Sequence, residues 1–239
     1  MVVHRGPNDG VTMPETETKP PARLERRGGT ALITLSGPAF CSGAVLSTLV
    51  ASADGRFDDV IAVYEGFLRV RRSPLPTIAA VNGPAVGAGL NLALACDVRT
   101  ASTSARFESR FPALRLHPGG GHTWLLERAV GRQRATMMNV FGEALDAAAA
   151  LQAGLIASVH SPDALVEETV ELASRATELD REYVEAVTAT LRTAEETPEH
   201  AGILDLETRR QRWSTGRPDF IAATRALQER ITGRERGSR

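Results

Sequence analysis

The segment that decides the fold reads PTIAAVNGPAVGAGLNLALACD and runs from Pro76 to Asp97. Residues 77–81 form an apolar run that predicts a buried strand, and the Asn-Gly-Pro sequence that follows ends this strand. The small residues at 87–89 (Gly-Ala-Gly) then begin a helix that we expect over residues 90–95. The first N–H groups of a helix have no partner within it, so such a turn can bind a ligand oxygen. The same residues also suit a closely packed joint, and this segment alone leaves both interpretations open.

Two other segments combine small residues with a neighbouring apolar run or helix. One reads AFCSGA at residues 39–44 and follows an apolar stretch at residues 30–35. The other reads HPGGGHT at residues 117–123 and precedes a predicted helix. Together with the first segment, they resemble the motifs of the crotonase family, also called the enoyl-CoA hydratase/isomerase superfamily. The family patterns are A-F-C-A-G-A-D, N-G-x-A-x-G-G-G-x-E-L-A-x-x-C-D and P-G-x-G-G-T, and the resemblance extends from about residue 29 to about residue 231.

The order of the expected elements predicts the fold class. Strands at residues 30–35, 77–81 and 97–102 alternate with a helix at residues 58–71, which indicates right-handed crossovers between parallel strands. Beyond residue 102 the hydrophobic periodicity is helical. The prediction is an α/β protein, and the resemblance implies the ClpP/crotonase fold, with ββα-type repeats, a mostly parallel sheet and a C-terminal helical region.

Three parts of the chain are expected from composition and from the resemblance. Residues 1–28 are rich in Pro, Gly, Thr, Glu and Arg without periodicity, which predicts a disordered N-terminal tail. Residues 29–160 are expected to form the crotonase core domain, and residues 161–239 a helical region that covers the site and makes trimer contacts. Family members also carry a first strand and a first helix ahead of the strand that leads into Phe40, and we expect both to be absent here.

Local signals place several helix boundaries. Gly131 is expected to separate two short helices, and Asp146 to cap a helix that Gly154 ends. Ser161 and Thr197, each followed by proline, predict two further helix starts.

The composition excludes several classes of function. Lys and Arg total 28 and Asp and Glu total 29, so the charges nearly cancel and indicate no nucleic-acid surface. The apolar runs are too short to cross a membrane, and the N-terminus lacks the apolar core of a signal peptide. Cys41 and Cys96 lie in apolar segments, which predicts buried free thiols in a reducing cytoplasm. No cysteine and histidine spacing indicates a metal site, and we expect none.

The resemblance implies an acyl-CoA thioester as the substrate, with coenzyme A as part of that substrate and no further cofactor. Chemistry at the carbons beside a thioester passes through an enolate-like state whose charge lies on the thioester oxygen. Two N–H donors aimed at that oxygen stabilise it by about 3–4 kcal/mol each. Position by position, the family's donors are the backbone N–H groups of Ala44 and Ala88, and Gly43, Gly87 and Gly89 are expected beside the substrate.

The acid/base positions depart from the family pattern. Typical hydratases carry one glutamate in the G-x-E-L segment and a second in a P-E segment, and the corresponding residues here are Asn91 and Phe111. Neither side chain can transfer a proton at neutral pH, although an asparagine can bind substrate or orient a water. Removal of a general acid or base typically costs roughly 10²–10⁴ in rate, which argues against ordinary hydration by two glutamates.

Three neighbouring residues are candidates to replace them. Glu108 could reach the site if its segment shifts, and its alternative is a solvated loop carboxylate. His122 begins a predicted helix, where the helix dipole favours a neutral imidazole that can accept a proton, and its alternative is a capping histidine. His117 precedes the glycine-rich turn and is a candidate to contact the acyl group.

Three functions remain open at this stage. The first is an enzyme of fatty-acid metabolism, nominally an enoyl-CoA hydratase/isomerase (a lyase or isomerase), that stabilises an enolate oxyanion and transfers protons with unusual residues. The second is a non-catalytic acyl-CoA-binding protein, and the third is a scaffold subunit with a vestigial pocket. The small residues Ala44, Ala88 and Gly89 argue against the third. The resemblance further implies a homotrimer or a dimer of trimers.

Overall fold

The computed structural model describes residues 22–27, 30–35, 37–44, 49–50, 52, 57–197 and 199–237. The chain divides into two compact units, residues 1–177 and residues 178–239. The candidate site lies in the first unit, and each unit is described by itself.

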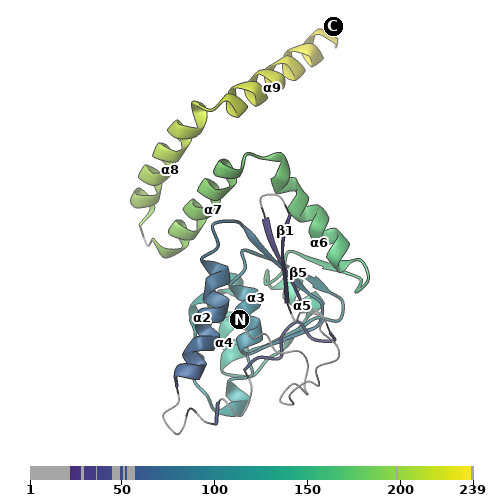
Figure 1. Ribbon diagram of the computed structural model, residues 1–239, viewed down its shortest axis with the longest axis vertical. Helices are drawn as coiled ribbons and strands as arrows, with labels where there is room; N and C mark the ends of the chain where they lie inside the picture. The colour runs from purple at the N-terminus through teal and green to yellow at the C-terminus, as the bar shows by residue number, and fades with distance from the viewer. Residues whose placement is uncertain are drawn as a thin grey trace. The chain divides into compact units, whose positions relative to one another are not determined.

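The first unit is built on a five-stranded sheet with the order β1-β2-β3-β5-β8 (Figure 1). These strands are Ala22–Arg27 (β1), Thr30–Leu35 (β2), Thr77–Val81 (β3), Val98–Ser102 (β5) and Ser158–His160 (β8). Strand β1 is antiparallel to β2, whereas the pairs β2–β3, β3–β5 and β5–β8 are parallel. The mostly parallel sheet expected from the alternation of strands and helices is therefore confirmed.

Strand β1 corrects one expectation. Its residues pair with β2 from Ala22 opposite Leu35 to Arg27 opposite Thr30, so a strand does precede residue 30. The sequence of β1 reads ARLERR and has almost no apolar pattern, because an edge strand is held by backbone pairing and tolerates charged side chains.

A second, three-stranded sheet positions the site. It has the order β4-β6-β7, with strands Pro84–Val86 (β4), Arg106–Glu108 (β6) and Leu145–Asp146 (β7). Strand β4 is parallel to β6, and β6 is antiparallel to β7. Cys41 forms a single parallel bridge with Ala85, which places the loop over residues 39–44 directly beside β4.

The helices of the first unit are Asp58–Arg71 (α2), Ala88–Leu94 (α3), His122–Asn139 (α4), Ala147–Gln152 (α5) and Leu165–Ser174 (α6), with short 3₁₀ turns at Pro112–Leu114 and Arg175–Glu178. Helix α2 has the predicted bounds. Helix α4 is broken at Gly131 (φ 74°, ψ 161°), as the prediction of two short helices around this glycine requires. The predicted cap of α5 is also confirmed, because the side chain of Asp146 accepts a 2.8 Å hydrogen bond from the Ala149 N–H.

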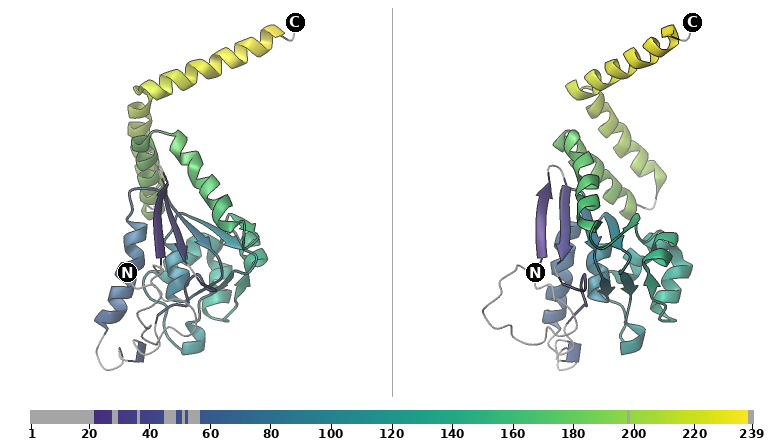
Figure 2. Two further views of the ribbon diagram at one scale, coloured as in Figure 1. Left: turned by 45° about the vertical axis from the view of Figure 1, so that its right-hand side comes forward. Right: turned by 90° about the vertical axis from the view of Figure 1, so that its right-hand side faces the viewer.

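Both faces of the five-stranded sheet are covered. Leu32, Ile78 and Ala80 form a buried cluster with residues of α6, which runs along the sheet (Figures 1 and 2). The alternate residues Ile33 and Ala79 belong to the main core, together with α3 and α4. Successive side chains of a strand point to opposite faces, so the central strands read as continuous apolar runs. Helix α6 lies within the predicted C-terminal region of residues 161–239, yet it packs on the sheet of the first unit.

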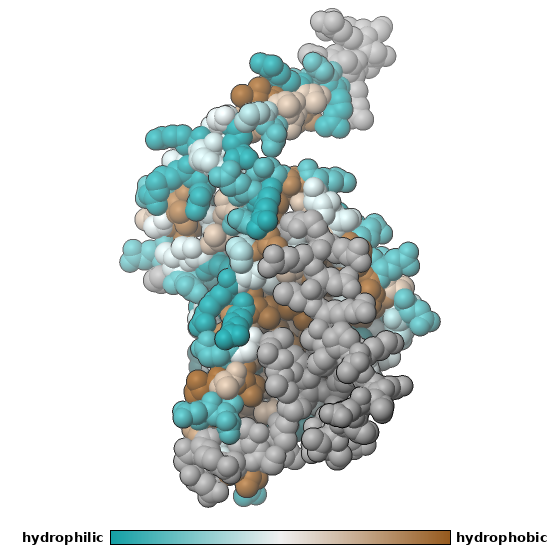
Figure 3. All heavy atoms as spheres, viewed as in Figure 1, coloured by the Kyte–Doolittle hydropathy of each residue, from teal (hydrophilic) through white to brown (hydrophobic). Residues whose placement is uncertain are grey.

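In the second unit, the described residues form the helices Arg181–Glu196 (α7), His200–Thr215 (α8) and Pro218–Gly237 (α9). Arg217, between α8 and α9, forms ion pairs with Asp180 and Glu182 at 2.5 and 2.7 Å. Hydrophilic residues cover much of the visible face of these helices, with smaller apolar patches between them (Figure 3). Several large apolar side chains are exposed: Leu191, Leu204, Phe220 and Leu227. The helical end of the chain agrees with the prediction.

Among the residues that the structure describes, no helix combines the length and the apolar character that a membrane crossing needs. Cys41 and Cys96 are both buried free thiols, as their apolar surroundings predicted, and burial raises the pKa of the Cys41 thiol.

Candidate active site

A cavity of about 420 Å³ lies at the N-terminal end of α3. It is bordered by the loop over residues 42–44, by the turn over residues 86–88, by α2 and by residues 109–119. Many of the lining side chains are apolar or small, including those of Val60, Val63, Leu114 and Leu116. Its volume and lining are those of a small-molecule site.

The two small-residue turns pack directly against each other. The Val86 N–H donates to the Cys41 carbonyl at 2.9 Å, and the Cys41 N–H donates to the Pro84 carbonyl at 3.1 Å. Gly43 has a φ of 100°, and a Cβ at this position would lie 2.7 Å from the Val86 oxygen and 3.6 Å from the Ala88 nitrogen. Glycine is therefore required for this approach.

Ala44 and Ala88, the two predicted N–H donors, both line this cavity. Ala88 is the first residue of α3, after Gly87 (φ 53°, ψ −116°), and its N–H consequently has no carbonyl partner within the helix. Neither of the two N–H groups meets an acceptor within the described part of the chain. Two unpaired backbone donors thus border one space.

The three glycines predicted beside the substrate have different positions. Gly43 and Gly87 line the cavity, but Gly89 is not part of its lining. A Cβ on Gly89 would lie only 2.0 Å from the Cys41 carbonyl oxygen, so this glycine allows α3 to pack against the loop that carries Ala44.

Asn91, His122 and Ser109 form a buried chain of polar contacts at the wall of the cavity. Each of the three residues is 1% exposed. The Nδ1 of His122 lies 2.5 Å from the Oδ1 of Asn91, and the Nε2 of His122 lies 3.0 Å from the Oγ of Ser109. Asn91 and Ser109 line the cavity themselves, whereas His122 lies behind them.

The hydrogen-bond network assigns the proton on His122. The Nδ2 of Asn91 donates to the Gly119 carbonyl at 3.0 Å, which leaves its Oδ1 as the acceptor facing His122. His122 must then carry its proton on Nδ1 and accept on Nε2, where the Ser109 hydroxyl donates. Burial lowers the pKa of His122 to about 4, so this neutral form persists at neutral pH.

Phe111, at the second glutamate position of the family, lines the cavity and contacts His122. The two ring centres lie 4.9 Å apart at an interplanar angle of 63°, an edge-on arrangement. An apolar ring therefore covers the imidazole at the position where hydratases carry a carboxylate. His122 is the first residue of α4, but the N-cap residue of this helix is Gly121 and no side chain caps it.

The two remaining candidates lie at the edge of the site. Glu108 forms an ion pair with Arg110 at 2.7 Å and is 3.8 Å from Arg106, and Glu108 is not part of the cavity lining. His117 does line the cavity, and its Nδ1 contacts the Pro118 carbonyl at 2.8 Å. Arg110, which pairs with Glu108, also lines the cavity.

Ser109 is a site residue that the sequence did not predict. It follows β6, and the parallel pairing of β6 with β4 brings it beside the turn of Ala88. The Gly87 N–H donates to the Glu108 carbonyl at 2.9 Å, and a Cβ on Gly87 would lie 3.7 Å from the backbone carbonyl oxygen of Ser109. This neighbourhood depends on a strand pairing that is not visible in the local sequence. Tyr64 of α2 also lines the cavity and was not predicted to do so.

Within the described residues, no group of three His, Cys, Asp or Glu side chains is arranged to hold a metal ion.

Comparison with known proteins agrees with the motifs. The model of the enoyl-CoA hydratase/isomerase family matches residues 22–219. The probable enoyl-CoA hydratase EchA14 of Mycobacterium tuberculosis is 46% identical over 209 residues, which cover 83% of this chain and 79% of that protein. The structure of DspI from Pseudomonas aeruginosa is similar to that of this chain, with a TM-score of 0.79 at 24% sequence identity. The similarity covers 90% of this chain and 97% of that chain. An enoyl-CoA hydratase subunit I from Geobacillus kaustophilus gives a TM-score of 0.78 at 24% identity, over 88% and 95% of the two chains. The predicted crotonase fold is confirmed.

Proposed function

Because this chain belongs to the enoyl-CoA hydratase/isomerase family, we propose that its cavity binds the thioester end of an acyl-CoA. In this complex the thioester oxygen accepts hydrogen bonds from the N–H groups of Ala44 and Ala88. The observation that supports the proposal is the packing of the two turns, since Ala44 and Ala88 both line one cavity.

The two donors favour an enolate over the neutral thioester. When a proton leaves the carbon next to the thioester carbonyl, negative charge develops on the oxygen that Ala44 and Ala88 hold. Donors that are fixed by the backbone need no rearrangement at that moment, and each stabilises such a charge by about 3–4 kcal/mol in acyl-transfer enzymes. The reaction class that follows is the addition, removal or movement of a proton beside a thioester, nominally hydratase or isomerase chemistry.

Non-catalytic binding of acyl-CoA is the second candidate function. It is favoured by Asn91 and Phe111, which stand where family hydratases carry glutamates, and by the ring of Phe111 against His122. Under this alternative the cavity holds the thioester and leaves it unreacted. His117 contacts the acyl group under either function, since it lies at the cavity wall.

We also propose a homotrimer, or a dimer of trimers, in the cytoplasm. The exposed apolar side chains of the second unit, among them Leu204 and Phe220, support contacts between copies of the chain. The two buried free cysteines support a reducing compartment. The boundaries of the three predicted parts, at residues 28 and 160, stay predictions.

The binding mode is tested by calorimetry with butyryl-CoA and with S-butyl-CoA, a thioether that lacks the carbonyl oxygen. We expect butyryl-CoA to bind more tightly, and we expect the Ala88→Pro variant to lose this difference because proline has no N–H. Arg181→Pro, at the first position of α7, is a matched control that should keep the difference. Parallel assays with crotonyl-CoA measure turnover and separate catalysis from mere binding. Absence of binding to any acyl-CoA would contradict the proposal.

A further inference from the structure

We propose that this protein hydrolyses acyl-CoA thioesters, with Ser109 as the nucleophile, His122 as its general base and Asn91 as the residue that orients the imidazole. The proposal rests on the thioester binding described above and adds a second activity to the same cavity. Neither Ser109 nor this order of contacts belongs to the two-glutamate pattern that the motifs of the chain resemble.

The three side chains have the connectivity of a nucleophile, a base and an orienting group. The Oγ of Ser109 lies 3.0 Å from the Nε2 of His122, within the range of about 2.6–3.2 Å expected for an activated nucleophile. The opposite nitrogen of the ring is held by the Oδ1 of Asn91. Asn91 is fixed in turn by its hydrogen bond to the Gly119 carbonyl. This arrangement leaves Nε2 free of its own proton and ready to accept one from the serine.

Ser109 also borders the cavity in which the thioester is proposed to bind. It lines the same cavity as Ala44 and Ala88, and the β4–β6 pairing places it beside Gly87, the residue that precedes the second donor. A nucleophile and two oxyanion donors at one cavity are the combination that acyl transfer needs. Arg110, the next residue, has a φ of 60°. This left-handed conformation is rare for residues other than glycine, and such residues are often found at functional sites.

The reaction balances with water as the second substrate. His122 takes the hydroxyl proton as the Oγ of Ser109 forms a bond to the thioester carbon, and the N–H groups of Ala44 and Ala88 hold the resulting oxyanion. The carbon–sulfur bond then breaks, and the thiol of coenzyme A leaves with the proton from His122. A water then attacks the carbonyl carbon of the acyl-serine ester and gives its proton to His122. The bond between this carbon and the Oγ of Ser109 breaks, and the Oγ takes the proton from His122. The products are a carboxylic acid and free Ser109, with no change in oxidation state.

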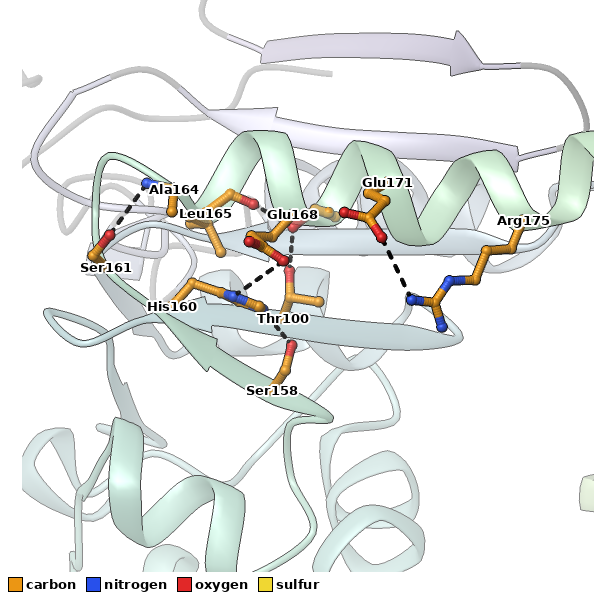
Figure 4. A network of polar contacts seen from close by, with 10 residues as sticks. Thr100, Ser158, His160, Ser161, Ala164, Leu165, Glu168, Glu171 and Arg175 are labelled. Atoms are coloured by element: carbon orange, nitrogen blue, oxygen red, sulfur yellow. Dashed lines mark hydrogen bonds and ion pairs between the residues drawn. The ribbon is translucent and has the colours of Figure 1, made fainter.

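A second serine–histidine pair shows which features matter. The Oγ of Ser158 lies 2.7 Å from the Nε2 of His160, and the Nδ1 of His160 lies 3.9 Å from Glu168 (Figure 4). Ser158 and His160 belong to β8 and Glu168 belongs to α6, and none of the three lines the cavity. Because the pair lies outside the cavity that Ala44 and Ala88 line, we assign it no chemistry. It supplies a matched control for Ser109.

The test measures release of coenzyme A from butyryl-CoA with a thiol reagent, together with the intact mass of the acid-quenched protein. We expect thiol release and an added butyryl group that peptide mapping places on Ser109. We expect Ser109→Ala to lower the rate by at least ~10³-fold while butyryl-CoA binding, measured by calorimetry, changes less than about threefold. Ser158→Ala should release thiol at the rate of the unchanged protein.

The outcomes separate this proposal from the one on which it rests. Binding of butyryl-CoA without thiol release, or release at an unchanged rate in Ser109→Ala, overturns the hydrolase and leaves the binding mode standing. Absence of binding overturns both. If Ser109→Ala fails to fold, the mass and position of the adduct in the unchanged protein still test the role of Ser109. An acyl group found on any other residue contradicts Ser109 as the nucleophile. Turnover without any acyl group on the protein contradicts it as well.

Discussion

The Nδ1 of His122 lies 2.5 Å from the Oδ1 of Asn91, and this contact joins the start of α4 to the middle of α3. Asn91 stands where the hydratases of the family carry a glutamate, and its neutral amide offers no charge to a substrate. The contact also holds the Nδ1 of the imidazole and directs the Nε2 toward Ser109. The polar chemistry of the cavity therefore depends on a histidine that lies behind its wall.

Loss of the amide of Asn91 should destabilise the fold. Asn91→Ala removes the acceptor of the His122 Nδ1–H, and an unsatisfied buried polar group costs about 1–3 kcal/mol. We expect a loss of this size in the free energy of urea unfolding. Asn82→Ala is the control, since its bond to the Gly37 carbonyl is exposed and water can replace it. Equal losses in the two variants would contradict the role given to Asn91.

Stability should depend on pH through His122. Burial lowers its pKa from 6.5 to about 4 in the folded protein, so between these values the unfolded chain binds more protons than the folded one. The contribution is fully present above pH 6.5 and is lost as the pH falls toward 4, a change of about 3 kcal/mol over this window. Urea unfolding at several pH values measures it. His122→Gln cannot titrate, and its stability should vary less over the same range; an identical pH dependence would exclude His122 as the source.

Two glycine-to-alanine substitutions should change the stability of the protein in opposite directions. A Cβ on Gly89 would meet the Cys41 carbonyl oxygen at 2.0 Å, so Gly89→Ala must separate α3 from the loop of Ala44, and we expect a loss of more than about 2 kcal/mol. Gly202 lies in α8, and a Cβ there would have only an ordinary 3.5 Å contact with Thr197. Gly202→Ala should stabilise the protein by about 0.5–1 kcal/mol, because alanine loses less entropy in a helix. Thermal unfolding compares the two, and a Gly89→Ala protein as stable as the parent would refute the close packing.

The sequence predicted those structural features that depend on neighbouring residues in the chain. The small residues at 87–89, the broken helix at Gly131 and the cap at Asp146 each act on their own neighbours, and the structure has them at the predicted positions. Helix α2 was predicted with the same bounds because a run of apolar residues marks one side of it. These elements are the ones whose conformation depends on residues within one turn of the chain.

Features that depend on distant partners were not predictable. Strand β1 has a polar sequence and exists through its pairing with β2. Ser109 reaches the cavity through the pairing of β6 with β4, and its hydroxyl meets a histidine 13 residues further along the chain. The roles considered for His122, a free base or a helix cap, both missed its contact with Asn91, because that contact joins two helices.

The choice between Glu108 and the Ser109–His122 pair is open to direct measurement. Glu108 was one candidate for proton transfer, but its carboxylate is paired with Arg110 and lies outside the cavity lining. Glu108→Gln removes the charge and keeps the size of the side chain, and we expect acyl-CoA turnover to change by less than about twofold, with a stability change below about 1 kcal/mol. Arg72, paired with Glu65 at an exposed site of α2, gives the control: Glu65→Gln removes a similar ion pair far from any acid/base role. A fall in turnover of roughly 10²-fold or more in Glu108→Gln alone would restore Glu108 as the general acid or base, because that is the loss expected when such a group is removed.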